Sequence, residues 1–231
     1  MLENEKALLK QKYGHNKWLL AVHMLGKYIK DIYHAPRFHT KISMRGQNNR
    51  CPYVPRECTV KIIGDNNTVE IDPSVKIFKG EITVGDFYSP ASNCRVYIGK
   101  NCTSNGTNIV LMEDGTTVSI GDDCMFSWGV DFFVTDFHTI CARDTTEIIN
   151  KGKELTVADH VWIAMHATIL KNSYIAKNSI VGAYAVVAGK FTEENCVLAG
   201  NPARVVKRQV CWHRDWPNRY RADSAGEYTE N

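Results

Sequence analysis

The feature that most constrains this chain is an aliphatic residue that recurs every six positions between residues 157 and 187. These residues are Val157, Ile163, Ile169, Ile175, Val181 and Val187. A period of six fits neither the 3.6-residue turn of a helix nor the two-residue alternation of a simple strand. The repeat predicts a parallel β-helix, in which three hexads form one triangular coil and successive coils stack through backbone hydrogen bonds.

The same unit recurs less regularly in the first part of the chain. Its aliphatic or aromatic positions there are Ile71, Ile98, Ile120, Phe126 and Phe132. The next position in this series is His138, and the regular hexads resume only at Val157. That interval is one residue longer than a full coil, so residues 139–155 form either an irregular coil or a protruding loop. We predict that the repeat domain spans residues 54–200.

The two ends of the chain lack the repeat. Residues 1–53 contain an apolar stripe at helical spacing between Leu19 and Tyr33. It predicts a helix that caps the open end of the coil stack, or alternatively one that binds a partner or a membrane surface. Pro202 ends the repeats, and the basic tail at residues 201–231 is predicted to contain a short C-terminal helix or an extended arm.

The net charge of +3 is small but unevenly distributed. Residues 1–60 contain eleven Lys and Arg against four Asp and Glu, and the C-terminal tail is also basic. These regions are either solvated surfaces or attract an anionic partner such as a phosphorylated cofactor or an acidic glycan. No apolar run approaches the roughly 18–20 residues that span a bilayer. The N-terminus also lacks a signal-peptide pattern, so we expect a cytoplasmic protein with no transmembrane segment and no nucleic-acid partner.

Cysteine spacing gives no indication of a metal site. The eight cysteines form no C-x-x-C pair and match no zinc pattern. Without a secretory context, reduced and unreactive thiols are expected. Cys102 and Cys124 fall at a small-residue core position of the hexads. We therefore expect no metal.

Three motifs resemble those of the left-handed β-helix acyltransferases, which include serine, galactoside and maltose acetyltransferases. They are TDFHTI (135–140), DHVWIA (159–164) and VLAGNPARVVK (197–207). The resemblance covers roughly residues 55–210. It implies a left-handed coil, an exception to the right-handed crossover rule. The flanking residues look closest to bacterial capsule O-acetyltransferases, particularly those that act on sialic-acid-containing capsules.

The resemblance implies an enzyme that transfers acetyl from acetyl-CoA to a hydroxyl of a polysaccharide. His138 matches the family histidine and is the expected general base, a role that suits an imidazole. Asp136 either orients His138, binds the acceptor or caps a turn. Trp162 matches the tryptophan that lines the acceptor and thioester site, or is an ordinary apolar surface residue. Thr139 and Ala164 replace a usual Pro and Gly, and neither change removes a chemical group.

Further residues are expected to contact acetyl-CoA. A backbone N–H near Ala164 or Gly182 is the expected oxyanion donor or pantetheine contact, and Ala199 lies in the closing motif. Lys207 and Arg208 follow the last coil and either meet the CoA phosphates or belong to a solvated tail. The resemblance also implies a homotrimer with each active site between two prisms.

Other functions remain open on the sequence. The γ-type carbonic anhydrases share this coil and bind zinc through three histidines, for which His138, His160 and His166 are candidates. The chain could instead be a structural β-helix module without catalytic activity. Among acetyltransferases, the acceptor could be a small sugar or a xenobiotic. The basic N-terminal region favours an anionic polysaccharide as the partner.

Overall fold

The computed structural model describes residues 41–75 and 77–221, and this part of the chain consists of strands, turns and loops without a helix. In chain order the strands are β1 (Lys41–Arg45), β2 (Cys58–Ile63), β3 (Thr68–Ile71), β4 (Ile77–Val84), β5 (Arg95–Ile98), β6 (Thr103–Leu111), β7 (Thr117–Ile120), β8 (Met125–Phe126), β9 (Val130–Phe133), β10 (Glu154–Val157), β11 (Trp162–Ile163), β12 (Thr168–Leu170), β13 (Tyr174–Ile175), β14 (Ile180–Val181), β15 (Val186–Val187), β16 (Lys190–Phe191), β17 (Val197–Gly200) and β18 (Ala203–Lys207). The fold is therefore mainly β, as the hexads predict.

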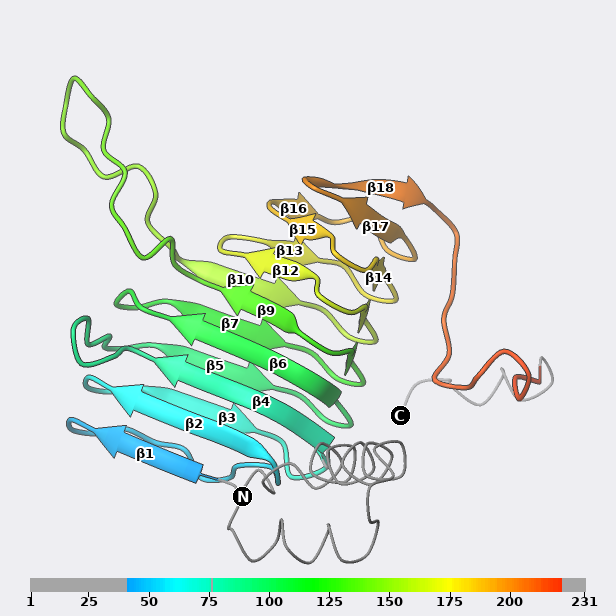
Figure 1. Ribbon diagram of the computed structural model, residues 1–231, viewed down its shortest axis with the longest axis horizontal. Helices are drawn as coiled ribbons and strands as arrows, with labels where there is room; N and C mark the ends of the chain where they lie inside the picture. The colour runs from blue at the N-terminus through cyan, green and yellow to red at the C-terminus, as the bar shows by residue number, and fades with distance from the viewer. Residues whose placement is uncertain (1–40, 76, 222–231) are drawn as a thin grey trace, which may run out of the picture. The chain divides into compact units, whose positions relative to one another are not determined.

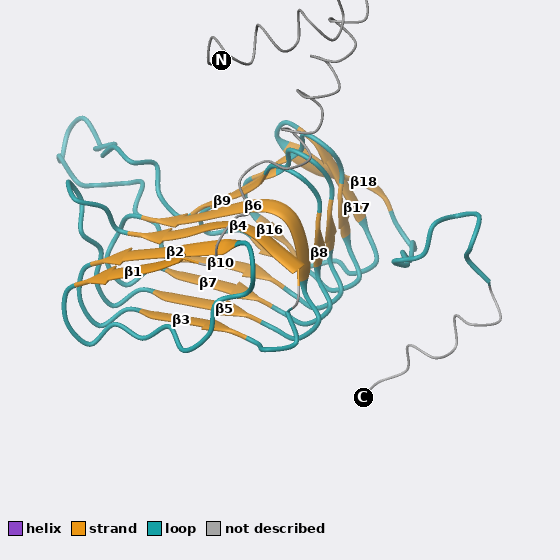
Figure 2. Cartoon of the chain, turned by 60° about the horizontal axis from the view of Figure 1, so that its bottom comes forward, coloured by secondary structure: helices purple, strands orange, loops and turns teal. Residues whose placement is uncertain are grey.

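The strands stack as successive coils (Figure 1). One sheet has six strands in the order β16-β13-β10-β7-β5-β3. The other has twelve, and it divides at β6, which pairs with β8 near its start and with β9 further along. From there β8, β11 and β14 form one side and β9, β12 and β15 another, so these coils have three sides (Figure 2). The pairs are parallel except for β17 with β18.

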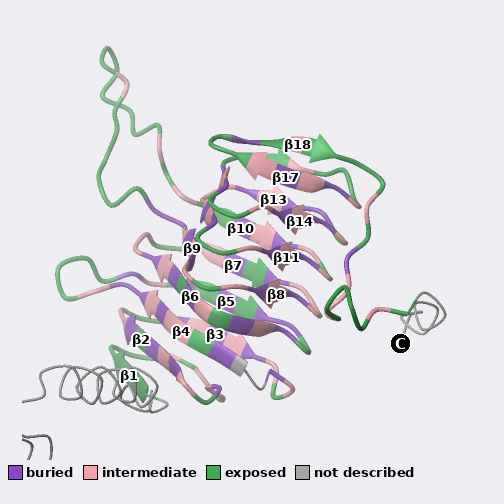
Figure 3. Cartoon of the chain, turned by 45° about the vertical axis from the view of Figure 1, so that its right-hand side comes forward, coloured by how far each residue is buried: buried purple, intermediate pink, exposed green. Residues whose placement is uncertain are grey.

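The register confirms the predicted coil of three hexads. Val157 pairs with Ile175, Ile163 with Val181, and Ile169 with Val187, each exactly one coil further along the chain. All six side chains are buried. Figure 3 shows buried positions alternating with intermediate or exposed ones along the strands. The aliphatic hexad position therefore faces the interior and forms three stacked columns, one on each side.

Phenylalanines fill the middle of this core. Phe126 is 1% exposed and lies between Phe78 and Phe132, with ring centroids 6.4 and 5.4 Å away. Both pairs meet edge to face, the arrangement that aromatic quadrupoles favour. Burying one such side chain contributes about 1.5–3 kcal/mol.

One corner of the coil is built from residues in the left-handed backbone conformation. They occupy equivalent positions in successive coils, two residues before β6, β8, β11, β14 and β17: Asn101, Asp123, His160, Asn178 and Asn195, with φ between 53 and 59°. Asn and Asp tolerate this conformation better than most side chains. We call these five residues the asparagine corner.

A long loop leaves the coil between β9 and β10. Val134 still donates its N–H to Val110 and Lys153 accepts the N–H of Thr117, so residues 135–152 are the part that leaves the stack. A single antiparallel bridge between Cys141 and Ile148 closes the loop, which extends away from the coils in Figure 1. Of the two alternatives left open for residues 139–155, the structure has the protruding loop, except that Glu154 and Leu155 already belong to β10.

The ends of the coil differ from the prediction. Residues 41–53 were assigned to the helical cap, but β1 pairs in parallel with β2 and adds a strand to the sheet. The side chains of β1 are all exposed, so this strand carries no inward hydrophobic signal. The predicted helix at residues 19–33 lies outside the described residues.

At the other end, residues 208–221 form an extended C-terminal arm rather than a helix, with one turn at Trp216–Tyr220. The part of the chain that the structure describes contains no helix suited to crossing a membrane.

Candidate active site

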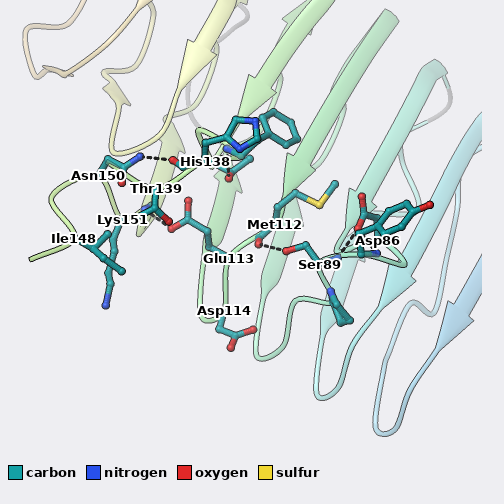
Figure 4. Close-up of a pocket in the computed structure, with 15 residues that line it drawn as sticks. Asp86, Ser89, Met112, Glu113, Asp114, His138, Thr139, Ile148, Asn150 and Lys151 are labelled. Carbon is teal, nitrogen blue, oxygen red and sulfur yellow. Dashed lines mark hydrogen bonds between the residues drawn. The ribbon is translucent and has the colours of Figure 1, made fainter. Parts of the chain in front are cut away.

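An open groove of about 840 Å³ lies along one edge of the coil stack (Figure 4). Its walls come from the β4–β5 loop, the β6–β7 loop and the base of the β9–β10 loop. These loops belong to successive coils, so they lie side by side at the same edge. The volume is within the usual range for a small-molecule site.

His138 lies in this groove, within a tight turn. Its backbone N–H donates to the carbonyl of Asp136 over 2.7 Å, and the intervening Phe137 has a φ of 61°. This is a γ-turn with a positive φ at its central residue, a form that is rare and strained. The hydroxyl of Thr135 accepts the N–H of Phe137 and supports the turn. Strained backbone of this kind is concentrated at functional sites, which agrees with the predicted role of His138.

The carboxylate of Asp136, for which orienting the His138 ring was one of three predicted roles, bonds to other groups. Its carboxylate forms an ion pair with Lys171 and accepts a 2.9 Å hydrogen bond from the side-chain amide of Asn150. The bond from Lys171, reinforced by that from Asn150, holds the pKa of Asp136 below its ordinary value against a small opposing effect of burial. Asp136 therefore braces the loop that carries His138.

Asn150 ties the two ends of this loop together. Its amide nitrogen also donates to the carbonyl of His138 over 2.8 Å, and its amide oxygen accepts the N–H of Ile140 over 2.9 Å. Figure 4 shows Asn150 facing His138 across the loop base. Sequence reasoning missed Asn150 and Lys171 because neither lies in one of the three motifs to which a chemical role could be assigned. Only the coil topology brings Lys171, from the turn after β12, to Asp136.

Three carboxylates in the groove walls accept hydrogen bonds from backbone N–H groups of the loops. Asp86 accepts the N–H groups of Tyr88 and Ser89, and Asp114 accepts that of Ser92. Glu113 accepts the N–H of Gly152 over 2.8 Å and so connects the β6–β7 loop to the β9–β10 loop. These bonds give the groove a defined shape around His138.

Trp162 lies elsewhere on the coil. It belongs to β11, is half-buried, and does not line the groove. Its ring is 6.2 Å from that of Trp212 in the C-terminal arm, at an angle of 46°. The structure therefore does not bring His138 and Trp162 into one groove within a single chain.

The three histidines of the zinc alternative occupy different surroundings. His160 lies in the asparagine corner and its Nδ1 is 2.6 Å from a carboxylate oxygen of Asp123. His166 stacks on Tyr184, with ring centroids 5.0 Å apart. His138 lies in the β9–β10 loop. No group of three potential metal-binding side chains occurs among the described residues.

Comparison with known proteins identifies the family, although no family model matches the chain. The chain is 34% identical over 180 residues to the polysialic acid O-acetyltransferase of Neisseria meningitidis, and the match covers 76% of this chain and 80% of that protein. The chain belongs to the O-acetyltransferase family of that enzyme. This confirms the resemblance seen in the three motifs and the prediction of an acetyl-CoA-dependent O-acyltransferase.

Other relatives agree with this family. A polysialic acid O-acetyltransferase of Escherichia coli O1:K1 / APEC is 34% identical over 140 residues, which cover 61% of this chain and 45% of that protein. The crystal structure of the polySia-specific acetyltransferase NeuO matches with a TM-score of 0.64 and 27% identity, covering 77% of this chain and 86% of that one. The polysialic acid O-acetyltransferase OatWY matches with a TM-score of 0.63 and 26% identity, covering 81% and 94%.

In this O-acetyltransferase, the small residues expected at the cofactor form a column. Ala164 follows β11, Gly182 follows β14, and Ala199 lies within β17. The strand register places these three residues at equivalent positions, one above the other. A Cβ on Gly182 would approach the Cβ of Ala199 to 3.2 Å, so the column is closely packed. The N–H groups of Ala164 and Gly182 donate to the carbonyls of the next coil over 2.8 Å. Neither N–H is therefore available as the oxyanion donor.

The two basic residues expected at the CoA phosphates differ in their contacts. Lys207 ends β18 and is exposed. The Nε of Arg208 donates to both carboxylate oxygens of Glu193, at 2.9 and 3.0 Å. Arg208 is thus held by an acidic side chain of the last coil, whereas Lys207 is exposed to solvent.

Proposed function

We propose that this O-acetyltransferase transfers acetyl from acetyl-CoA to a hydroxyl group of polysialic acid. The observation that carries the proposal is the 34% identity to the Neisseria meningitidis enzyme across 80% of that protein. The predicted small-sugar and xenobiotic acceptors share the same histidine motif. They have no comparable support among the relatives described above.

We assign the general base to His138. A neutral imidazole takes the proton of the acceptor hydroxyl as its oxygen attacks the thioester carbonyl carbon. The tetrahedral intermediate then collapses, the carbon–sulfur bond breaks, and the imidazolium returns the proton to the CoA thiolate. General-base assistance typically contributes roughly 10²–10⁴ in rate. The groove around His138 and the strained turn that presents it support this assignment.

We further propose a homotrimer, with left-handed coils, in which one chain's His138 meets the Trp162 of a neighbour. The separation of His138 and Trp162 within one chain supports this arrangement. The protruding β9–β10 loop is long enough to reach an adjacent prism or the acceptor. In the same scheme the pantetheine arm passes the column of Ala164, Gly182 and Ala199, and Lys207 meets a CoA phosphate.

Mass spectrometry of acceptors tests the proposed substrate. The purified protein is incubated with acetyl-CoA and, separately, with polysialic acid, free sialic acid, maltose and chloramphenicol. We expect a gain of one or more acetyl groups on polysialic acid alone, and loss of this gain in both His138→Ala and His138→Asn. Acetylation of another acceptor in preference to polysialic acid would overturn the substrate. Full activity in His138→Asn would refute the assignment of His138 as the general base.

Subunit mixing tests the shared site. His138→Ala and Trp162→Ala are each expected to lose most, but not all, of the activity, and refolding or co-expressing the two together should restore part of it. Mixed trimers contain interfaces where an intact His138 faces an intact Trp162. A monomer in light scattering, or mixtures without recovered activity, would contradict the trimeric arrangement.

A further inference from the structure

The C-terminal arm runs back along the asparagine corner instead of leaving the coil. The N–H of Val210 donates to the carbonyl of Asn195 over 3.0 Å. Trp212 then contacts His160, and Arg214 reaches Asp123 and Asn101. The arm therefore contacts successively earlier coils, as its path beside the stack in Figure 1 indicates. Of the two alternatives predicted for this segment, a short helix or an extended arm, the described residues form the arm.

Trp212 is the most buried side chain of this arm, with 5% exposure. Its ring stacks on that of His160, with centroids 4.1 Å apart and an interplanar angle of 10°. Its indole N–H donates to the carbonyl of His160 over 2.9 Å, and Nε2 of His160 lies 3.2 Å from the carbonyl oxygen of Trp212. The two residues are thus joined by stacking and by two polar contacts.

Arg214 fixes the arm two residues further on. Its guanidinium pairs with the carboxylate of Asp123 over 2.8 Å and donates to the carbonyls of Asn101, Asp123 and Cys124, each over 3.1 Å. A fifth contact joins it to the hydroxyl of Thr103 over 2.9 Å. Its side chain is only 26% exposed. A planar guanidinium with several donors suits this cluster of oxygen atoms.

This attachment places Trp212 against Trp162. The carboxylate of Asp123 binds both His160 and Arg214, and it therefore connects the two halves of the attachment. Trp162 belongs to a strand of only two residues and is half-buried on the coil. Trp212 lies beside its ring, with the centroids 6.2 Å apart.

We infer that Trp212 and Arg214 are positioning residues for acetyl transfer, because the arm that they anchor holds the Trp162 indole in its working orientation. The inference rests on the proposed function, in which Trp162 lines the acceptor and thioester site. Small misplacements of a group that orients substrate can lower rates by roughly a hundredfold. Loss of Trp212 therefore affects turnover more than it affects capture of acetyl-CoA.

Two substitutions and a matched control test this inference. Trp212→Ala removes the whole contact, and Trp212→Phe keeps a ring against His160 but loses the indole N–H. The control is Trp216→Ala on the same arm, whose ring is 73% exposed. We expect kcat to fall about tenfold or more in Trp212→Ala, with the KM for acetyl-CoA changing less than about twofold. Trp212→Phe should recover part of the loss, and Trp216→Ala should match the parent protein.

The double variant Trp162→Ala/Trp212→Ala separates positioning from general stability. If Trp212 acts through Trp162, then removing Trp212 causes little further loss of kcat once Trp162 is absent. The circular-dichroism exciton couplet of the two indoles provides a readout that is independent of catalysis. It should disappear in Trp162→Phe and in Trp212→Phe, and persist in Trp216→Phe.

The outcomes distinguish this inference from the proposed function. Acetyl-CoA hydrolysis is measured beside transfer, so that the comparison does not depend on one acceptor. One outcome would support the inference but refute polysialic acid as the acceptor. In that outcome the parent protein shows the exciton couplet, Trp212→Ala lowers the rate of acetyl-CoA hydrolysis, and polysialic acid is not acetylated. A folded Trp212→Ala variant with the kcat of the parent protein would refute the inference. So would a double variant in which the two losses of kcat are fully additive; neither result would affect the proposed acceptor.

Discussion

Asn150 holds the base of the loop that presents His138, and Asn150→Ala is the sharpest test of this site. The side chain makes three hydrogen bonds of 2.8–2.9 Å, to Asp136, to the carbonyl of His138 and to the N–H of Ile140. None of these bonds is replaced by an alanine methyl group. Asp136 keeps its ion pair with Lys171. The variant therefore loses the hydrogen bonds that join the two ends of the loop but keeps one contact between the loop and the coil.

The size of the effect follows from these three bonds. Each contributes a net 0.5–1.5 kcal/mol or so, and their partial exposure to solvent favours the lower end of that range. Their loss destabilises the closed conformation of the loop by about 1.5 kcal/mol. Since about 1.4 kcal/mol corresponds to a factor of ten, we expect kcat to fall about tenfold. The KM for acetyl-CoA should change little, because Ala164, Gly182 and Ala199 do not line this groove.

Initial rates of CoA release at saturating acetyl-CoA, with thermal denaturation of the same samples, provide the assay. The matched control is Asn108→Ala, which removes another exposed Asn–Asp hydrogen bond of 2.9 Å, between β6 and β9. This control should keep the kcat of the parent protein. Asn150→Asp should also lose activity, because it removes both amide donors and adds a negative charge beside Asp136. A folded Asn150→Ala variant with kcat within twofold of the parent would refute the role of the loop base.

Two further predictions concern the core and the attachment of the arm. Phe126→Ala should lower the free energy of unfolding by about 3–5 kcal/mol, measured by denaturant titration, because it empties a fully buried ring site; an unchanged unfolding midpoint would contradict this packing. Burial raises the pKa of Asp123, but the hydrogen bond from His160 and the charge of Arg214 outweigh it and leave the pKa below its ordinary value of 3.8. The stability that this carboxylate supplies is therefore complete above pH 3.8 and is lost as the pH falls through the lower pKa of the folded state. The melting temperature of Asp123→Asn should accordingly lie below that of the parent protein at neutral pH, and the two should converge only in strong acid.

Periodicity predicted the coil because its signal is repeated and inward-facing. Val157, Ile163 and Ile169 each pair with the residue one coil later, and every one of them is buried. The strand β1 escaped prediction for the opposite reason: its five side chains are exposed, so nothing in its sequence marks an inner face. Its place in the sheet depends on backbone hydrogen bonds to β2, which are independent of side-chain pattern.

The candidate site was predictable only where a family motif marks it. His138 and Trp162 were found through their motifs, whereas Asn150 and Lys171 act through hydrogen bonds and charge that depend on the folded path of the chain. The same limit applies to Arg214. Its partners Asp123 and Asn101 precede it by 91 and 113 residues, and a local reading of the basic tail indicated only a solvated surface or an anionic ligand.

The coil geometry explains why His138 and Trp212 lie in segments that do not repeat. Along a flat side, the backbone groups bond to neighbouring coils and alternate side chains fill the core, which leaves little freedom for chemistry. His138 lies in a loop that the hexads exclude, and Trp212 lies in an arm that follows the last coil. Regular hexads therefore provide a rigid frame, and the segments that break the repeat can change without disturbing it. In this family, differences in acceptor preference are accordingly expected in the β9–β10 loop and the C-terminal arm, so exchanging these two segments between relatives should alter acceptor choice while leaving the melting temperature of the coil nearly unchanged.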